Sequence, residues 1–405
     1  MRVGLFTDAY TPLVNGVSTS VMMLKTALEK AGHQVFIVTV NYDGFGNVVE
    51  NDGKLIRLGG VPTGIYETRL TSVYSVRAIK KIKKWKLDVI HSHTEFGVGT
   101  FGRFVAKQFN IPLVHTYHTM YEDYIYYITH GYFDGLSKKL VEYFTLFYCD
   151  KTATELIVVS KKAYSLFKDK YNVNKNIHII PTGIEIESFF KKNFTKKAVL
   201  DLRVSYGLDR DDFVILFVGR VATEKSIDVL IEGQKEIVKK YPHVKLVIMG
   251  DGPDMEKLKE LTNKLKVDKN VIFIGKVELH NRFIHYQLPD VFATASRSET
   301  QGLTVIESMA ASVPVVAADD DNFKEVVVDD LNGYLFSDKK DYVKKIEILI
   351  NDKEKLSFLS KQALITAKKH DIRHYADDMV EVYNCALKNM KKSNLLDKMF
   401  GDKNE

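Results

Sequence analysis

The sequence predicts an α/β protein built from two domains, each with a parallel β-sheet. Short apolar segments that suit buried strands alternate with segments of helical periodicity, which is the pattern of parallel sheets wrapped by helices. The alternation stops near residue 180 and starts again at "FVILFVGR", residues 213–220. A chain of 405 residues is also too long for one ordinary hydrophobic core, so two domains are expected.

The first half of the chain begins with a strand, "RVGLFT", which leads through a loop at Gly16 into the helix "VSTSVMMLKTALEKAGH". Further strands are expected at "QVFIVTV", "LDVIHSH", "IPLVHTYH" and "ELIVVS". The segment 176–189, "NIHIIPTGIEIESF", has the proline and glycine that are typical of a connection between domains. We therefore place the first domain at residues 1–181.

The second half repeats this order of strands and helices. After "FVILFVGR", strands are expected at "KLVIMG", "VIFIGKV", "DVFATAS" and "PVVAA". The intervening helices are expected to begin at Ser226, Asp254, Glu278 and Leu303. The second domain is placed at residues 182–374.

The composition is that of a soluble globular protein, with 45% apolar and 27% charged residues. No apolar run approaches the roughly 18 residues that a membrane-spanning helix needs. The N-terminus "MRVGLFTDAYTP" is interpreted as a first strand and not as a secretory signal. Cys149 and Cys385 lack the spacing of a metal knuckle or a disulfide framework, so a reducing cytoplasm is the expected compartment.

Two motifs follow predicted strands, at the sheet edge where ligands bind in folds of this type. "PLVNGVSTS" brings Gly16 to a helix start, where unpaired N–H groups and the helix dipole suit a phosphate. The alternative is a turn glycine before a helix that Ser18 caps. In "FVGRVATEKS", Arg220 and Lys225 can neutralise a pyrophosphate without a metal, or they are solvated surface cations.

The segment "SETQGLTVIESMA", residues 298–310, places two glutamates on a loop and on the helix that follows it. Glu299 can reach a reacting centre, whereas Glu307 can accept hydrogen bonds from vicinal hydroxyls such as those of a ribose. Gly302 lets the backbone approach a ligand closely and offers the N–H groups of Leu303 and Thr304 to it. These residue types together indicate a sugar nucleotide.

The ordered set "PLVNGVSTS", "VGRVATEKS" and the E-x7-E pattern in "SETQGLTVIESMA" resembles the retaining glycosyltransferases of family 4, which have the two-domain GT-B fold. The match runs over nearly the whole chain. The resemblance implies α-glycosyl transfer from a nucleotide diphosphate sugar, usually UDP-linked, with neither a metal nor a cofactor. It also implies that the chain end, about residues 375–405, packs back on the first domain.

The resemblance also implies a role for individual residues. Arg220 and Lys225 would hold the diphosphate with the backbone at Gly16, and Glu307 would bind the ribose. Glu299 would position the donor sugar and stabilise charge, with a covalent role left open, and His118 would lie near the sugar hydroxyls and the anomeric carbon. The backbone near two residues would contact the base, namely Lys276 and Val277. The donor sugar and phosphate would contact Gln301, Gly302, Leu303 and Thr304.

Two features imitate metal sites, but no metal is expected. The run Asp319–Asp321 resembles a D-x-D motif that belongs to a different glycosyltransferase fold, so we interpret it as a polar loop. His91 and His93 alternate at a strand end without an evident third ligand and are interpreted as structural. Many relatives have a glycine-rich stretch after "PVVA", where this chain has "ADDDNFKEVV", so ligand contacts through glycines are in doubt there.

Basic charge is concentrated in residues 67–86, which hold seven Lys or Arg and one Glu, a net charge equal to the +6 of the whole chain. Apolar residues recur every third position within this stretch, which is typical of a basic amphipathic helix on an anionic membrane. The residues predicted to contact the membrane are Arg77, Lys80, Lys81, Lys83, Lys84 and Trp85. The alternative is a helix that packs on the sheet through its apolar stripe, with Trp85 in the core.

The aromatic segment that begins "HTYHTMYEDY" can line a groove for a lipid or form part of the core. Within family 4, this segment and "HSHTEFGVG" most resemble the enzymes that glucosylate diacylglycerol. The resemblance implies a UDP-glucose donor, a diacylglycerol acceptor, an anionic membrane surface as partner, no nucleic acid, and a peripheral location on the inner face of the cell membrane. Two alternatives stay open, namely a soluble small-molecule or polysaccharide acceptor and a sugar-nucleotide epimerase.

Overall fold

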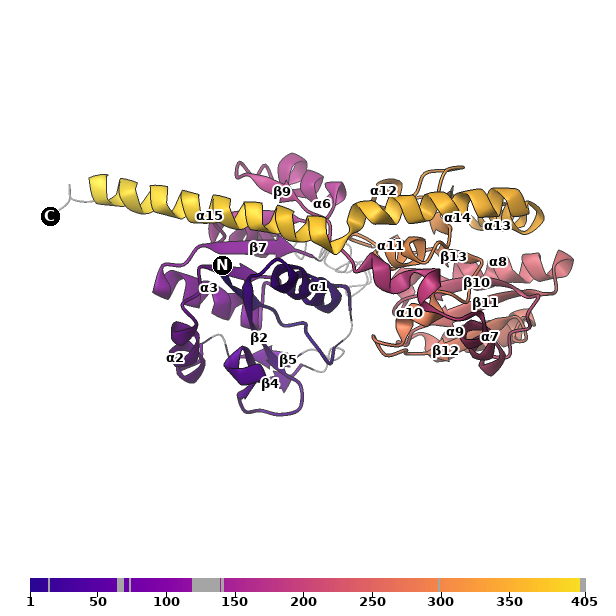
Figure 1. Cartoon of the computed structure of the whole chain (residues 1–405), viewed down its shortest axis with the longest axis horizontal. Helices are drawn as coiled ribbons and strands as arrows, with labels where there is room; N and C mark the ends of the chain where they lie inside the picture. Colours follow the sequence, from indigo (N-terminus) through magenta and orange to yellow (C-terminus); the bar gives the residue numbers. More distant parts are fainter. Residues whose placement is uncertain are drawn as a thin grey trace. The chain divides into compact units, whose positions relative to one another are not determined.

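The structure is a computed structural model that describes residues 1–13, 15–63, 69–72, 74–118, 139, 142–297 and 299–400, with side chains as far as residue 391. Residue contacts divide the chain into two compact units, which we call unit 1 (Met1–Gly183 with Ile372–Glu405) and unit 2 (Ile184–Asp371). Figure 1 shows unit 1 in indigo and purple, together with the long yellow C-terminal helix. The two units are described separately.

Unit 1 contains a nine-stranded sheet of order β3-β4-β2-β1-β6-β7-β8-β9, in which β5 also pairs with β4. The pairs from β4 to β9 along this order are parallel, whereas β3 and β5 are antiparallel to β4. The strands are β1 (Arg2–Phe6), β2 (Gln34–Asn41), β3 (Val48–Glu50), β4 (Leu55–Pro62), β5 (Arg69–Thr71), β6 (Val89–Ser92), β7 (Leu113–Tyr117), β8 (Glu155–Val158) and β9 (Ile177–Ile179).

In the described residues, helices of unit 1 form three hydrophobic clusters with the sheet. In the first cluster, Leu24 of one helix lies with Tyr375 and Met379 of the C-terminal helix, and Figure 1 shows these two helices beside each other. In the second, Ile82 and Phe101 belong to two further helices. The α-helices are α1 (Gly16–Lys30), α2 (Val76–Trp85), α3 (Gly97–Phe109), α6 (Lys161–Ser165) and α15 (Ile372–Phe400), and π-helices span Phe147–Lys151 and Leu166–Lys170.

The start of α1 corrects one prediction, because the cap of this helix is Asn15 and not Ser18. Asn15 Oδ1 accepts a hydrogen bond from the Ser18 backbone N–H over 2.8 Å. Ser18 Oγ in turn accepts from the Asn15 backbone N–H over 2.9 Å. This reciprocal arrangement is a capping box, which satisfies two donors at the helix start.

Unit 2 contains a six-stranded sheet of order β12-β11-β10-β13-β14-β15, and all of its neighbouring strands are parallel. The strands are β10 (Phe213–Val218), β11 (Val244–Met249), β12 (Val271–Gly275), β13 (Val291–Thr294), β14 (Val315–Ala318) and β15 (Gly333–Phe336). The helices are α7 (Lys196–Ser205), α8 (Ile227–Lys240), α9 (Met255–Leu265), α10 (Arg282–His285), α11 (Leu303–Ala310), α12 (Asp321–Lys324), α13 (Lys339–Asn351) and α14 (Lys353–Ala367).

Strand β10 shows why this sheet is covered on both faces. Ile215 and Phe217 belong to one buried cluster, whereas the alternate residues Val214 and Leu216 belong to another. Successive side chains of a strand point to opposite faces, so a continuous apolar strand needs a core on each side. The predicted fold class, two α/β domains with parallel sheets, is confirmed.

One predicted helix start is wrong. The helix expected from Glu278 begins only at Arg282, as α10, because residues 278–281 form a turn in which Asn281 N donates to the Glu278 carbonyl over 3.0 Å. Helices α8 and α9 begin within one residue of the predicted Ser226 and Asp254. The helix predicted at Leu303 begins at that residue.

Candidate active site

The carboxyl ends of the unit 2 strands place most of the predicted donor-site residues at one sheet edge. Arg220 follows β10, Lys276 and Val277 follow β12, and Glu299 lies between β13 and α11. Because all of these strands are parallel, their carboxyl ends lie at the same edge of the sheet. Arg220 and Val277 are half-buried, and Lys276 is exposed.

An ion pair joins two of the predicted residues. Lys225 Nζ lies 2.5 Å from Glu299 Oε1, and the two side chains are 14% and 24% exposed. Lys225 ends a short 3-10 helix, Thr223–Lys225, directly before α8. The structure therefore brings together Lys225, which is predicted to bind the diphosphate, and Glu299, the predicted catalytic carboxylate. The position of each of these two charges depends on the other.

Glycines after β11 hold the loop that carries Arg220. A Cβ atom at Gly250 would lie 1.8 Å from the Gly219 carbonyl oxygen, and one at Gly252 would lie 2.3 Å from the Val221 carbonyl oxygen. Val221 N also donates to the Asp251 carbonyl oxygen over 3.0 Å. The two backbones approach closely only because side chains are absent there, so Gly250 and Gly252 shape the site although sequence reasoning gave them no role.

Glu307 lies inside α11 with two partners that sequence reasoning missed. Its side chain is 5% exposed, Arg282 Nη2 lies 3.2 Å from Oε1, and Tyr286 Oη donates to Oε2 over 2.6 Å. Burial and then the Glu307 charge raise the pKa of Tyr286 well above its usual value. A carboxylate oxygen can accept more than one hydrogen bond. The fixed carboxylate of Glu307 therefore keeps the capacity to bind hydroxyls. Arg282 and Tyr286 lie seven and eleven residues after the end of β12, and no motif near Glu307 in the sequence pointed to them.

The loop before α11 ends in a glycine with a left-handed backbone. Gly302 has φ +72° and ψ +55° and precedes the helix, a left-handed conformation that favours glycine. Leu303 and Thr304 are the first two residues of α11, so their N–H groups have no partner within the helix. Gln301, Leu303 and Thr304 are half-buried.

In unit 1, Gly16 is the exposed first residue of α1, directly after the cap. A Cβ atom at this glycine would have no heavy atom within 4 Å. The space around Gly16 is therefore open on the side where a side chain would stand. Its role in holding a diphosphate stays a prediction.

His118 belongs to a row of imidazole rings at the ends of β6 and β7. His118 Nε2 and His93 Nδ1 are 3.0 Å apart, and the rings of His93 and His91 are 4.1 Å apart. His91 Nδ1 contacts Tyr383 Oη over 2.8 Å and its Nε2 contacts Thr116 Oγ1 over 2.7 Å. Burial lowers the pKa of His118 to about 4, and it lowers the pKa values of His91 and His93 as well. All three rings are thus neutral near pH 7, and both nitrogens of His91 are already engaged.

Unit 1 also contains a buried cluster of three possible metal ligands, which the sequence analysis did not predict. Ligand atoms of Glu95, His115 and Cys149 lie within 4.8 Å of one another, and His115 Nε2 is 3.2 Å from Glu95 Oε1. Burial raises the pKa of the Cys149 thiol well above its usual value. Burial, followed by the positive charge of Arg103, lowers the pKa of His115. Within this group, His115 pairs with Glu95 beside Cys149, and we assign the group no role in the site.

The basic helix α2 keeps its charges at the surface but not its tryptophan. The exposed residues are Arg77, Lys80, Lys81, Lys83 and Lys84. Trp85 is 7% exposed, its ring lies 5.0 Å from that of Phe36, and its Nε1 donates to the Gly53 carbonyl oxygen over 2.8 Å. The prediction that Trp85 contacts a membrane is therefore corrected, because this side chain belongs to the core of unit 1.

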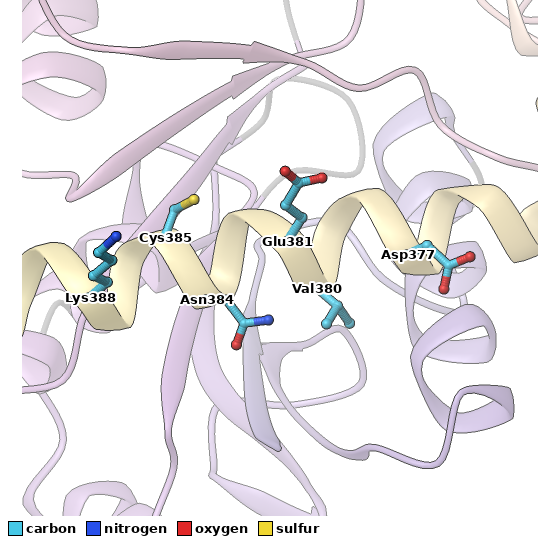
Figure 2. Close-up of a pocket in the computed structure, with 6 residues that line it drawn as sticks. All are labelled: Asp377, Val380, Glu381, Asn384, Cys385 and Lys388. Carbon is cyan, nitrogen blue, oxygen red and sulfur yellow. The ribbon is translucent and has the colours of Figure 1, made fainter.

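One surface hollow in the described part of unit 1 is lined by none of the predicted site residues. Figure 2 shows an open hollow whose labelled side chains, including Glu381 and Cys385, all come from α15, and none is a predicted site residue. The predicted aromatic groove falls largely on residues 119–138, which lie outside the described residues. Among the helices of the described part of the chain, none is long and apolar enough to cross a membrane.

Comparisons with known proteins agree with this arrangement. The family model described as Glycosyltransferase Family 4 matches residues 14–188, and the model described as Glycosyl transferases group 1 matches residues 200–365. Alpha-monoglucosyldiacylglycerol synthase from Acholeplasma laidlawii is 38% identical over 403 residues, which are 97% of this chain and 100% of that protein. The protein of the same name from Streptococcus pneumoniae is 36% identical over 84% of this chain and 76% of its own length.

Solved structures show the same fold at lower identity. Anabaena Alr3699/HepE in complex with UDP-glucose has a TM-score of 0.74 and 16% identity, over 95% of this chain and 100% of that chain. WaaG, a glycosyltransferase involved in lipopolysaccharide biosynthesis, has a TM-score of 0.71 and 15% identity, over 95% of this chain and 99% of that chain. From its family models, its relatives and its two parallel-sheet units, the chain belongs to family 4 of the glycosyltransferases and has their GT-B fold.

Proposed function

We propose that this protein transfers glucose from UDP-glucose to the free hydroxyl of 1,2-diacylglycerol at an anionic membrane surface, with retention of the α configuration. The observation that carries the acceptor is the 38% identity, along the full length of both chains, to a protein named as alpha-monoglucosyldiacylglycerol synthase. The site geometry of unit 2 supports the donor. The proposal therefore joins a lipid acceptor to a sugar-nucleotide site.

The donor half of the proposal uses the charged edge of unit 2. Arg220 and Lys225 would neutralise the diphosphate, while the fixed carboxylate of Glu307 would accept hydrogen bonds from the ribose diol. The N–H groups at the start of α11 suit phosphate or sugar oxygens. The relative Alr3699/HepE was solved with UDP-glucose, which supports this choice of donor.

The transfer step needs no group beyond the two substrates and these residues. The bond between the anomeric carbon and the phosphate oxygen breaks, and the acceptor oxygen forms its bond on the same face of the sugar. The departing β-phosphate takes the proton of the acceptor hydroxyl, so charge and atoms balance. Glu299 would stabilise the positive charge that develops on the sugar ring, and Lys225 would stabilise the leaving phosphate. The neutral imidazole of His118 would hydrogen-bond to a sugar hydroxyl.

The acceptor half of the proposal uses the exposed face of α2. Its Arg and Lys side chains point to solvent while its apolar stripe packs on the sheet, so the helix is held in place and the charges remain free to meet anionic lipids. Tyr74 and Val76, at the start of this helix, are 49% and 57% exposed and offer apolar contact beside the charges. This surface supports a peripheral association with the inner face of the cell membrane.

A transfer assay tests the proposal directly. Labelled UDP-glucose, EDTA and diacylglycerol in phosphatidylglycerol vesicles are incubated with the protein, and the lipid products are separated. We expect label in a monoglucosyl lipid despite the chelator, with α linkage by glycosidase digestion. A product that forms only when Mg²⁺ is added would overturn the metal-free step, and no labelled lipid would overturn the acceptor.

A charge-reversed variant separates the lipid acceptor from a soluble one. Replacing four lysines of α2 by glutamate (Lys80→Glu, Lys81→Glu, Lys83→Glu and Lys84→Glu) should remove vesicle binding and lipid turnover. Each basic group near an anionic surface contributes about 1 kcal/mol to binding. Hydrolysis of UDP-glucose without any acceptor should persist. Lipid turnover that is insensitive to this change would contradict the proposed membrane surface.

A further inference from the structure

We propose that Asn322 is a positioning residue of the donor site, which fixes the main chain of Glu299 and thereby the carboxylate that pairs with Lys225. The inference rests on the proposed function, in which Glu299 and Lys225 serve the donor. Asn322 lies in α12, within "ADDDNFKEVV", directly after β14.

The amide of Asn322 has a fixed orientation. Its side chain is 2% exposed, and Nδ2 donates to the Glu299 carbonyl oxygen and, over 3.2 Å, to Asp320 Oδ1. Asp320 Oδ1 also accepts from Asn322 N over 3.0 Å. Rotating the amide by half a turn would set Oδ1 against two oxygen acceptors, so the network selects one orientation.

The residue after Asn322 contacts the other end of the same loop. A Cβ atom at Gly302 would lie 2.8 Å from Phe323 Cε1, so the phenyl ring lies against the Gly302 backbone. Phe323 is 1% exposed and belongs to a core cluster of unit 2. Two successive residues of α12 therefore hold the two ends of the loop from Glu299 to Gly302.

Asn322 is not the residue that stability alone would favour. Its Oδ1 is buried and has no hydrogen-bond partner among the described residues. A buried acceptor without a partner destabilises the folded state. Removing the whole amide abolishes this penalty but also takes the Asn322 donor from the Glu299 carbonyl, and these two effects on stability oppose each other. Alanine should therefore change the stability modestly and the loop position strongly.

A variant that loses the amide should lose far more turnover than nucleotide affinity. A displacement of about 1 Å at reacting groups lowers the rate by about 10²-fold. Glu307 is held separately, through Tyr286 and Arg282, so the ribose end of the site is not disturbed. For Asn322→Ala we expect a kcat about 10²-fold lower with diacylglycerol vesicles and in acceptor-free hydrolysis of UDP-glucose. The Kd for UDP, measured by calorimetry, should rise by a much smaller factor, because Lys225 moves with Glu299 while the ribose end stays held.

The matched control is Asp321→Asn, at the neighbouring position of α12. Its carboxylate is 76% exposed and pairs with Lys324, so this change should leave kcat at the wild-type value. The calorimetric stoichiometry gives the fraction of folded sites, and kcat is expressed per site. A merely structural role of Asn322 would lower that fraction and leave the kcat per site unchanged.

Asn322→Asp adds a pH readout that a structural role would not give. An ionised carboxylate cannot donate to the Glu299 carbonyl, whereas a protonated one can. Burial and the Asp320 charge raise the pKa of such a carboxyl group. The kcat of this variant, relative to wild type at the same pH, should therefore recover as the pH falls.

The outcomes separate this inference from the proposed function. Wild-type kcat per site in Asn322→Ala, or no recovery of Asn322→Asp at low pH, overturns the role of Asn322. A wild type that glucosylates no lipid but hydrolyses UDP-glucose would contradict the proposed acceptor. The role of Asn322 would then be tested by the kcat of hydrolysis alone. A wild type that turns over no UDP-sugar at all overturns both.

Discussion

The predicted site residues at the sheet edge of unit 2 include charged pairs, whereas those at the sheet edge of unit 1 are neutral. At the edge of unit 2, Lys225 pairs with Glu299 and Arg282 with Glu307. At the edge of unit 1, the rings of His93 and His118 are neutral near pH 7, because burial lowers their pKa values. Paired charges suit an anionic diphosphate, whereas neutral rings suit sugar hydroxyls, so each unit has the chemistry of a different part of the proposed substrates.

The largest loss of activity is expected when a charge is removed from the sheet edge of unit 2. Lys225→Met removes the cation proposed to meet the diphosphate and leaves the Glu299 carboxylate without its partner at 2.5 Å. We expect kcat/KM for glucosyl transfer to fall about 10²–10³-fold, the cost typical of losing one charge-stabilising contact in a transition state. Initial rates with labelled UDP-glucose measure the loss.

The control for this substitution is Lys239→Met. Lys239 also pairs with a glutamate, Glu236, but both side chains are exposed and lie on α8 away from the strand ends. Wild-type kcat/KM in the control, beside a large loss in Lys225→Met, supports the charged edge as the donor site. Equal rates in the two variants would contradict it.

A smaller effect is expected from the buried carboxylate of Glu307. Tyr286→Phe removes the 2.6 Å hydrogen bond to Oε2, and a hydrogen bond to a charged group contributes about 1.5–3 kcal/mol. The free energy of unfolding in urea should fall by about that amount, and the Kd for UDP should rise because the carboxylate is less firmly held.

Tyr342→Phe is the matched control for Tyr286→Phe. Tyr342 is equally buried in unit 2, but its hydroxyl has no hydrogen-bond partner among the described residues. Its removal should leave the free energy of unfolding unchanged or raise it, since a buried polar group without a partner is lost. A similar loss of stability in both variants would mean that ring packing, and not the bond to Glu307, is measured.

Much of the fold was predictable because it depends on local patterns. Continuous apolar strands such as β10 need cover on both faces, and they are separated by helices with caps and glycines that the sequence displays. The left-handed Gly302 before α11 was predictable for the same reason, as its place between a polar loop and an apolar helix is visible in the sequence. Strands β3 and β5 were missed because they are short, antiparallel to β4 and partly exposed, so they lack the apolar signal of the central strands. Strand β4 was missed as well, although it has eight residues and is parallel to β2.

The rest of the site depends on contacts between residues far apart in the sequence. No sequence pattern near Glu307 predicts its contact with Tyr286, and none near Glu299 predicts its contact with Asn322. The burial of Trp85 depends on Phe36 and Gly53, which come from other elements of unit 1. Periodicity identified the apolar stripe of α2, but only the packed sheet shows that the stripe faces inward.

The smallest effect is expected from the neutral edge, as a change in the pH dependence of stability. The pKa of His118 is about 4 in the folded protein, and an unfolded histidine titrates near 6.5. Below pH 6.5 the unfolded chain therefore binds a proton that the folded chain does not, and the stability from neutral His118 is lost as the pH falls from 6.5 towards 4. The slope is at most about 1.4 kcal/mol per pH unit for one histidine.

A comparison of variants with the wild type separates the contribution of His118 from an opposing contribution of Asp8. Burial raises the pKa of Asp8 to about 6, so this carboxyl binds its proton in the folded state first and stabilises unit 1 as the pH falls. The difference between wild type and His118→Asn is therefore measured, by urea unfolding between pH 7 and 5. Trp85, the single tryptophan, is buried in unit 1, so its fluorescence reports this unit. His118→Asn should flatten the fall in stability, whereas exposed His243→Asn should not; equal curves for all three proteins would mean that His118 is not held neutral by burial.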